Sequence, residues 1–304
     1  MAIITPALIT ALSTSFKAHF QGALEVAPSD YQKISTVVPS SGASNTYGWL
    51  GQFPKLREWV GARVVKNMAA HGYAVTNKLY EGSVGVKRTD IEDDSVGVYK
   101  PLFEEMGRAA GSHPDETMFA LLKAGHSSLC FDGQNFFDTD HPVFPSVDGT
   151  GSPATVTNTF EPGANPGAAW YLLDASRPLK PLIYQERIKP EFTSMTKVDD
   201  ESVFTNDEYR YGVRARNNGG FGFWQMAVRS TKPLDQASFE EAYDAMRAFA
   251  ADGGRPLNLK ATILVCPTSL RSAAKAVVGV AKLANGSDNP NYNLVEILDT
   301  AWLN

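Results

Sequence analysis

Cysteine, positive charge and long apolar runs are all scarce in this chain. Cys130 and Cys266 are the two cysteines among 304 residues. Both stand among apolar or turn residues, so we expect reduced, packed thiols rather than a disulfide framework. Lys and Arg total 28 against 33 Asp and Glu, a net charge of −5. This balance disfavours a protein whose task is to grip nucleic acid, because neutralising phosphates needs a dense basic face.

Signals for secretion and membrane insertion are also missing. No apolar run approaches the ~20 residues that span a bilayer. The N-terminal stretch MAIITPALITALSTSFKAHF has no basic leader and no small-residue cleavage site, so we interpret it as an amphipathic helix in a protein made in a cytosol. With 43% apolar residues, the chain is long enough for one large domain or two ordinary ones.

The N-terminal region predicts a helix followed by an extended arm. Thr5 and Pro6 are typical of a helix start, and apolar residues then recur every four positions on one face. These residues are Leu8, Leu12, Phe16 and Phe20. The following PSDYQKISTVVPSSGASNTYG is rich in Pro, Ser and Gly, which indicates an extended arm that makes contacts at a distance.

Residues 57–66 and 73–88 predict a long two-stranded ribbon. Both segments are rich in Val, Tyr and Trp, and NMAAHG between them has the composition of a turn. An isolated ribbon is marginally stable in water, because each strand has one neighbour and no second layer covers it. We therefore expect another molecule to cover residues 57–88.

Helical periodicity follows the ribbon. A helix is predicted to start near Asp93, with a restart at Pro114, because proline suits the first helical position. The sequence then has loop composition over residues 131–168 and strand composition over 170–230. Within the strand region we interpret NNGGFGFW as a hairpin turn, since it lacks the glycine spacing of a nucleotide-binding loop.

The last part of the chain predicts a compact β/α unit. Ser238 with Glu241 forms a capping box at the start of a helix that ends at Gly253. ATILVCP then reads as a buried strand, SLRSAAKAVVG as a helix and NLVEILDTAWL as a strand. We expect this unit to be a second domain.

One motif, FDGQNFFDTDHP, contains residue types that bind metals. A metal-dependent hydrolase is a remote alternative that would use four of its residues, namely Asp132, Asp138, Asp140 and His141. The spacing matches neither a zinc signature nor a calcium loop. Turns at Asp132-Gly133 and at Asp140-His141-Pro142, with two phenylalanines plugging the loop, explain the composition more simply. A thiolate pair of Cys130 with His126 or His141 is less favoured than a buried, inert cysteine.

Charge is distributed unevenly along the chain. Basic residues dominate 55–88 and acidic residues dominate 90–116. One interpretation is two solvated faces; the other is a basic ribbon lying over the acidic helix of another copy, where opposite potentials fix the register. The residues expected to make these contacts between subunits, together with two phenylalanines of the N-terminal helix, are Phe16, Phe20, Lys78, Lys87, Arg88, Asp93, Asp94, Glu104 and Glu105.

Several segments taken together resemble the major head subunit of phage Mu and Mu-like prophages. They are AVTNKLYEGSVGVKRTDIEDD, DGQNFFDTDHP, YGVRARNNGGFGFWQ and LVCPTSLRSAA. The resemblance implies an α+β, HK97-type major capsid fold and a structural protein with no enzymatic activity and no cofactor. It implies an N-terminal helix and arm (1–52), an E-loop (53–92), a peripheral domain with a spine helix (93–230) and an axial domain (231–304). WYLLDASRPLKPLIYQERIKP precedes the β/α unit here, so a permuted segment order is expected.

The function implied by the resemblance is a shell subunit of the virion. It would self-assemble in the host bacterial cytoplasm into hexamers and pentamers of an icosahedral phage head around double-stranded DNA held without sequence specificity. Its partners would be copies of itself, a portal, a scaffold and decoration proteins. No contact with a membrane is expected. A cellular nanocompartment (encapsulin-like) shell of the same fold is the alternative within the structural class.

Overall fold

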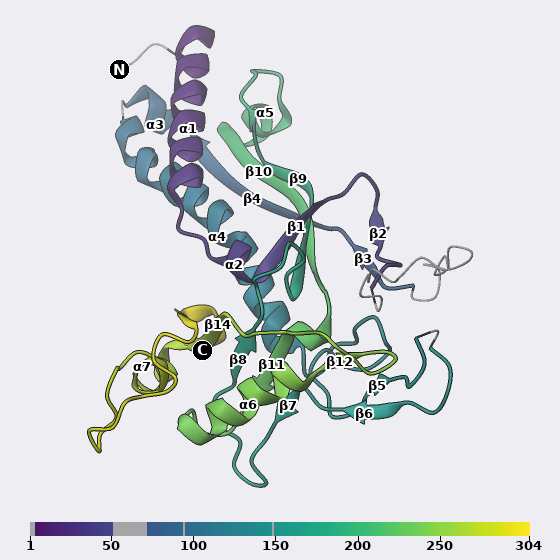
Figure 1. Ribbon diagram of the computed structural model, residues 1–304. Coiled ribbons are helices and arrows are strands. Elements are labelled where there is room, and N and C mark those ends of the chain that lie inside the picture. Colours follow the sequence, from purple (N-terminus) through teal and green to yellow (C-terminus); the bar gives the residue numbers. More distant parts are fainter. Residues whose placement is uncertain (1–3, 51–71, 94, 148) are drawn as a thin grey trace.

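The computed structural model describes residues 4–50, 72–93, 95–147 and 149–304. The chain forms an elongated α+β molecule with a four-stranded sheet and two long helices at one end and a five-stranded sheet at the other (Figure 1). The predicted segment 57–66 and the residue Asp94 lie outside the described residues. Within the described part, no helix is both long and apolar enough to cross a bilayer.

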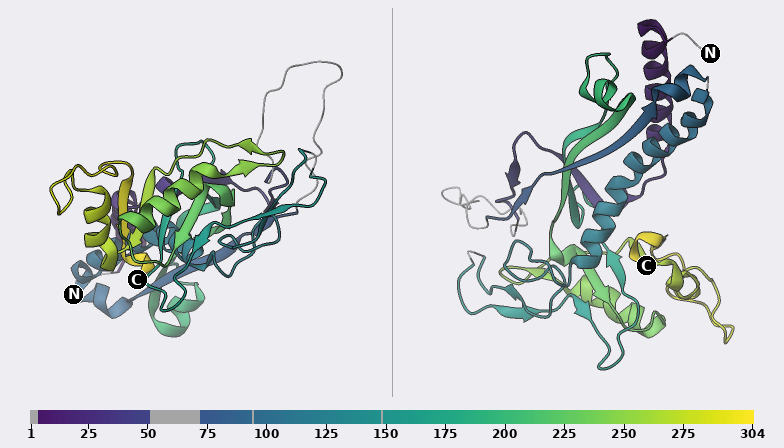
Figure 2. Two further views of the ribbon diagram at one scale, coloured as in Figure 1. Left: turned by 60° about the horizontal axis from the view of Figure 1, so that its bottom comes forward. Right: turned by 180° about the vertical axis from the view of Figure 1, so that it is seen from behind.

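Two long helices run side by side in the first half of the molecule (Figures 1 and 2). α1 (Pro6–Val26) starts as predicted, with the Thr5 hydroxyl accepting a hydrogen bond from the Leu8 amide at 3.2 Å. α4 (Lys100–Ala124) is one continuous helix with Pro114 inside it, so the predicted restart there is wrong. The helix continues through the lost hydrogen bond because the turns on both sides pack into the cores.

The predicted start of the long helix near Asp93 is also corrected. α3 (Arg88–Glu92) and the 3₁₀ helix η1 (Ser95–Tyr99) come first, and α4 begins at Lys100. The acids near Asp93 therefore belong to short helical turns.

Glycines in α4 allow α1 to approach closely. A Cβ atom on Gly107 would lie 2.2 Å from the Phe20 carbonyl oxygen, and one on Gly111 would lie 2.5 Å from the Ala27 Cβ. The two positions are four residues apart, so they share one face of the helix. The backbone of α1 therefore lies in a notch of the long helix.

The four-stranded sheet has the order β1-β9-β10-β4. β10 is antiparallel to both its neighbours, and β1 is parallel to β9. The strands are β1 (Ser35–Pro39), β4 (Lys78–Lys87), β9 (Leu182–Met195) and β10 (Glu208–Phe221). NNGG lies within β10, so the predicted hairpin turn is wrong; the glycines instead allow close approach, since a Cβ atom on Gly220 would lie 2.4 Å from Val75.

The predicted isolated ribbon is wrong for residues 78–87. β4 pairs with β10 along its whole length, from Lys78↔Asn217 to Lys87↔Glu208. One face of this sheet is covered within the same chain, where Val86 and Tyr211 are buried with Phe103 of α4. The sheet pairing and this second layer supply the cover that the sequence argument assigned to another molecule.

The five-stranded sheet has the order β15-β14-β8-β11-β7. Its strands are β7 (Thr159–Phe160), β8 (Trp170–Leu173), β11 (Ala227–Ser230), β14 (Ile263–Pro267) and β15 (Glu296–Thr300). β14 pairs with β8, so the sheet joins strands from both sides of residue 231. The sheet therefore crosses the predicted boundary at residue 231, because a sheet is held by pairing irrespective of order in the chain.

The helices of this end agree with the predicted β/α unit. α6 (Gln236–Ala248) and α7 (Arg271–Val278) contact β11 and β14, respectively. The predicted capping box is wrong: the Asp235 carboxylate accepts from the Ser238 amide at 2.9 Å, while Glu241 pairs with Lys232. Moving the cap by three residues leaves the buried face of Phe239 and Met246 unchanged.

Shorter elements join these layers. The remaining helices are α2 (Tyr31–Ile34), α5 (Glu201–Asn206), η2 (Trp224–Met226), η3 (Thr268–Leu270) and η4 (Ala301–Leu303). The remaining strands are β2 (Ser44–Thr46), β3 (Ala74–Thr76), β5 (His141–Val143), β6 (Ala154–Val156), β12 (Ala250–Ala251) and β13 (Arg255–Pro256).

Candidate assembly surfaces and the buried Cys-Asp-His cluster

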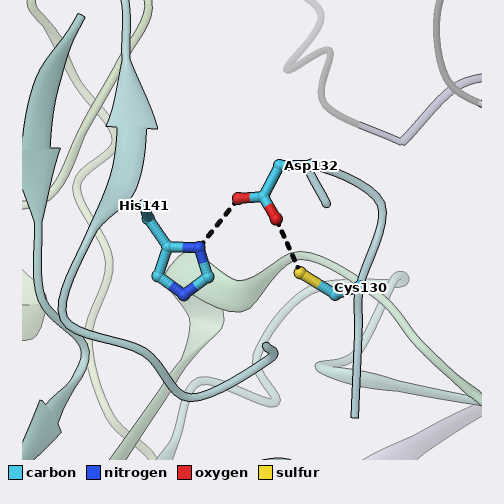
Figure 3. Close-up of side chains that lie close together, drawn as sticks. All are labelled: Cys130, Asp132 and His141. Carbon is cyan, nitrogen blue, oxygen red and sulfur yellow. Dashed lines mark hydrogen bonds and ion pairs between the residues drawn. The ribbon is translucent and has the colours of Figure 1, made fainter. Parts of the chain in front are cut away.

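The motif FDGQNFFDTDHP brings three polar side chains together inside the protein (Figure 3). The Asp132 carboxylate accepts hydrogen bonds from the Cys130 thiol at 3.0 Å and from His141 Nδ1 at 2.7 Å. The His141 ring is fully buried and stacks on Trp224, with ring centroids 4.0 Å apart. A turn at Gly133, with a φ of 88°, lets Asp132 fold back onto its own loop.

Hydrogen bonds set the electrostatics of this cluster. Burial alone would raise the pKa of Asp132, but the hydrogen bonds from His141 and Cys130 outweigh it and hold that pKa below its usual range. Burial and the nearby Asp132 charge raise the pKa of the Cys130 thiol well above its usual range. The cysteine is therefore a protonated donor and an inert one.

The four residues of the hydrolase alternative do not form one site. Asp138 accepts hydrogen bonds from the amides of Asn135 and Thr139, and Asp140 is exposed. Among the described residues, the group that could hold a metal is Cys130 with Asp132 and His141. The Cys130 thiol, the Asp132 carboxylate and His141 Nδ1 are already used in hydrogen bonds within the cluster, which favours a structural role, while His141 Nε2 is buried without a hydrogen-bond partner among the described residues.

The structure of this loop confirms some of the other predictions made for it and contradicts one. Phe136 and Phe137 plug the core as predicted, and the first of them stacks on Phe221. His141 begins β5, so the predicted second turn at Asp140-His141-Pro142 is instead the start of a strand. Both cysteines are free and buried, as expected.

The phenylalanines expected to contact a neighbouring subunit are buried in their own chain. Phe16 stacks on Phe103 with ring centroids 4.2 Å apart and meets Tyr211 edge to face at 5.3 Å. Phe20 packs against Phe192 of β9. The N-terminal helix is therefore docked on its own molecule, and the expected arm contact does not need these two side chains.

The charged residues proposed for assembly divide into two groups. Three have ion-pair partners in the same chain: Arg88 pairs with Glu92, Glu104 with His19 and Lys100, and Glu105 with Arg108. Lys78, Lys87 and Asp93 are exposed and have no ion pair among the described residues. The second group is thus available to a neighbouring molecule.

The chain matches the model of the family described as "Mu-like prophage major head subunit gpT" over residues 9–303. It belongs to this family. It is 50% identical over 285 residues to the major capsid protein of Escherichia phage Mu, covering 94% of this chain and 93% of that protein. It is 49% identical to the Mu-like prophage FluMu major head subunit of Haemophilus influenzae, covering 90% and 89%.

Solved capsid structures share the fold over nearly the whole chain. The procapsid protein of bacteriophage JBD30 matches with a TM-score of 0.88 and 70% identity, over 98% of this chain and 100% of that one. The JBD30 capsid matches with a TM-score of 0.75 and 54% identity, over the full length of both chains. This head subunit therefore has an α+β capsid fold and is a structural protein, not an enzyme; neither the hydrolase nor the nanocompartment alternative is favoured.

Two features of the head subunit had escaped sequence reasoning. Asp115, inside α4, is buried and accepts hydrogen bonds from the amides of Asp30 and Tyr31, which holds the start of α2. The second feature is the hydrogen bond from the Cys130 thiol to Asp132, since the sequence analysis weighed Cys130 only as a thiolate partner of His126 or His141. Spacing did not signal the Asp115 contacts, because they join segments that are 84 and 85 residues apart.

Proposed function

We propose that copies of this major capsid protein form hexamers and pentamers of an icosahedral head that encloses double-stranded DNA. The observation that carries this is the match to capsid proteins from residue 9 to residue 303. The net charge of −5 supports a wall that holds DNA without gripping it, because an acidic subunit neutralises few phosphates. Assembly would take place in the bacterial cytoplasm.

A portal, a scaffold and decoration proteins complete the proposed set of partners. One solved JBD30 structure, which matches this chain with a TM-score of 0.76 and 51% identity, is a capsid decorated with minor capsid protein trimers. A related trimer is the decoration partner proposed for this chain.

We also propose the domain division expected from the sequence: an arm (1–52), an E-loop (53–92), a peripheral domain (93–230) and an axial domain (231–304). The β8–β14 pairing joins strands of the last two domains. The permuted order of segments remains part of the proposal. β8 precedes α6 in the chain, yet it forms the middle of the sheet that α6 and α7 contact.

One assembly contact follows from the unpaired charges. We propose that Lys87 of one subunit faces Asp93 of a neighbour. Lys87→Glu should lower the yield of assembled particles several-fold while the subunit stays folded, and adding Asp93→Lys should restore it. Particle yield by sedimentation and folding by circular dichroism are the measurements.

Lys275→Glu, at an exposed position of α7, is the matched control for this test because it makes the same change in net charge. Equal yields for Lys87→Glu and the unaltered chain would remove this contact from the proposal.

A further inference from the structure

The end of the β9–β10 hairpin carries large apolar side chains in solvent. Phe204 is 87% exposed, Val198 74% and Met195 44%. They lie on α5, on the preceding loop and at the end of β9, at the tip of the hairpin far from the five-stranded sheet (Figure 1). Val203, next to Phe204, is buried in the core, so this end is held in place while Phe204 points away from it. Apolar side chains gather at the surface in this way where a partner covers them.

Acidic residues surround this apolar end. Between 196 and 207, four acids stand against one lysine, Lys197. Asp199, Glu201 and Asp207 are exposed; Arg88 Nη1 lies 3.9 Å from Asp207, and Arg210, which lies opposite Met195, is paired with Glu208. We call residues 195–207 the hairpin tip. The surface that receives it must combine apolar contact with positive charge.

The outward face of the same sheet offers that combination at its other end. Leu79 is 60% exposed and lies opposite Arg216, which in turn lies opposite Ile188. Arg214, two residues earlier, is exposed on the same face but lies between Glu81 and Glu191, which balance its charge, so Arg216 supplies the positive charge beside Leu79. Arg216 has no ion pair among the described residues. We call Leu79, Ile188 and Arg216 the Leu79 face.

A chain cannot place its own tip on its own Leu79 face. The tip begins where β4 ends at Lys87, and the eight residues from Leu79 to Lys87 span about 26 Å at ~3.3 Å per residue. Paired antiparallel strands along this length keep the two ends apart. We propose that the hairpin tip of one copy docks on the Leu79 face of a second copy, with Phe204 packed on Leu79 and the tip acids on Arg216.

Such a contact suits a shell. The two surfaces differ, so each copy receives one tip and delivers another, and the contact passes from molecule to molecule around a ring or across a lattice. This inference rests on the role as a major capsid protein and adds which surfaces meet.

Disulfide crosslinking tests the contact directly. Shells co-assembled from a Phe204→Cys chain and a Leu79→Cys chain should give a reducible dimer on mild oxidation, because Cys130 and Cys266 are buried and do not compete. Co-assembly of Phe204→Cys with Val280→Cys, another exposed apolar position, should give none. If shells form normally but the Phe204→Cys and Leu79→Cys chains give no crosslink, the docking proposal is wrong and the proposed capsid function still stands. If the unaltered chain never forms multimers, both the docking proposal and the proposed capsid function are wrong.

Charge reversal provides a second measurement. Arg216→Glu should reduce shell yield at least tenfold, and combining it with Asp199→Lys and Glu201→Lys should restore most of the yield. Thermal unfolding of the unassembled subunits separates loss of docking from loss of folding. Rescue supports the pairing, and the same low yield in the combined variant, with folding intact, contradicts it.

Discussion

At the residue scale, the most informative position is Asp132. Its carboxylate accepts hydrogen bonds from a buried thiol and from Nδ1 of a buried imidazole at once, and it also accepts from the Gln134 amide at 3.1 Å. A carboxylate between two buried donors looks like a metal site in the sequence, where only the residue types are visible. In the folded chain these residues form a hydrogen-bonded cluster, the Asp132 tie, that holds the loop to β5 and Trp224.

Removing this tie should destabilise the subunit. Asp132→Asn retains one acceptor oxygen but places an amide group against a donor, so we expect the free energy of unfolding to fall by about 1–3 kcal/mol. Chemical denaturation of the unassembled subunit measures it. Asp140→Asn, at an exposed position of the same loop, is the control and should change stability by less than about 0.5 kcal/mol. Equal effects of the two substitutions would contradict a special role for Asp132.

The same carboxylate predicts a pH dependence. Because the pKa of Asp132 is lower in the folded chain than the ordinary value of an aspartate, the ionised group stabilises the fold above that ordinary value. This stability is lost as the pH falls through the folded-state pKa. The stability difference between the unaltered chain and Asp132→Asn should therefore be constant from about pH 5 to 7 and shrink below about pH 4. A difference that grows on acidification would contradict the assigned shift.

At the scale of elements, the α1–α4 crossing organises the first half of the molecule. The apolar stripe of α1 was visible in the sequence, since it depends on local period alone. The partner was not, because Gly107 and Gly111 resemble ordinary helix-weakening residues until the second helix is in place. The surface under α1 was not visible in the sequence for the same reason, because an apolar stripe does not say which surface the helix lies on.

Gly107→Ala tests this crossing. The added methyl would meet the Phe20 carbonyl oxygen at 2.2 Å, so α1 must shift and stability should fall by about 1–3 kcal/mol despite the better helix propensity of alanine. The melting temperature of the unassembled subunit reports the change. Gly22→Ala, in exposed space on α1, should be neutral or stabilising by up to about 1 kcal/mol. A stable Gly107→Ala variant would show that the helices do not need this notch.

At the scale of the whole molecule, the features that could not be predicted from the sequence are those that depend on which strands pair. The terminal β/α unit and the helix types were predictable because their periods are local. The placement of β8 beside β14, and of β4 beside β10, was not, because sheet partners come from distant parts of the chain. This is why the predicted isolated ribbon was wrong while the capsid family was recognised. Recognition of the family depends on several motifs spread along the chain, so a wrong prediction for one element does not change it.

The central claim is that this chain builds a shell from copies of itself. Its most direct test is sedimentation velocity of the purified chain at rising concentration, with negative-stain microscopy of the fast fraction. We predict capsomers and closed shells whose share grows with concentration. A single species of about 33.0 kDa at every concentration would contradict the claim.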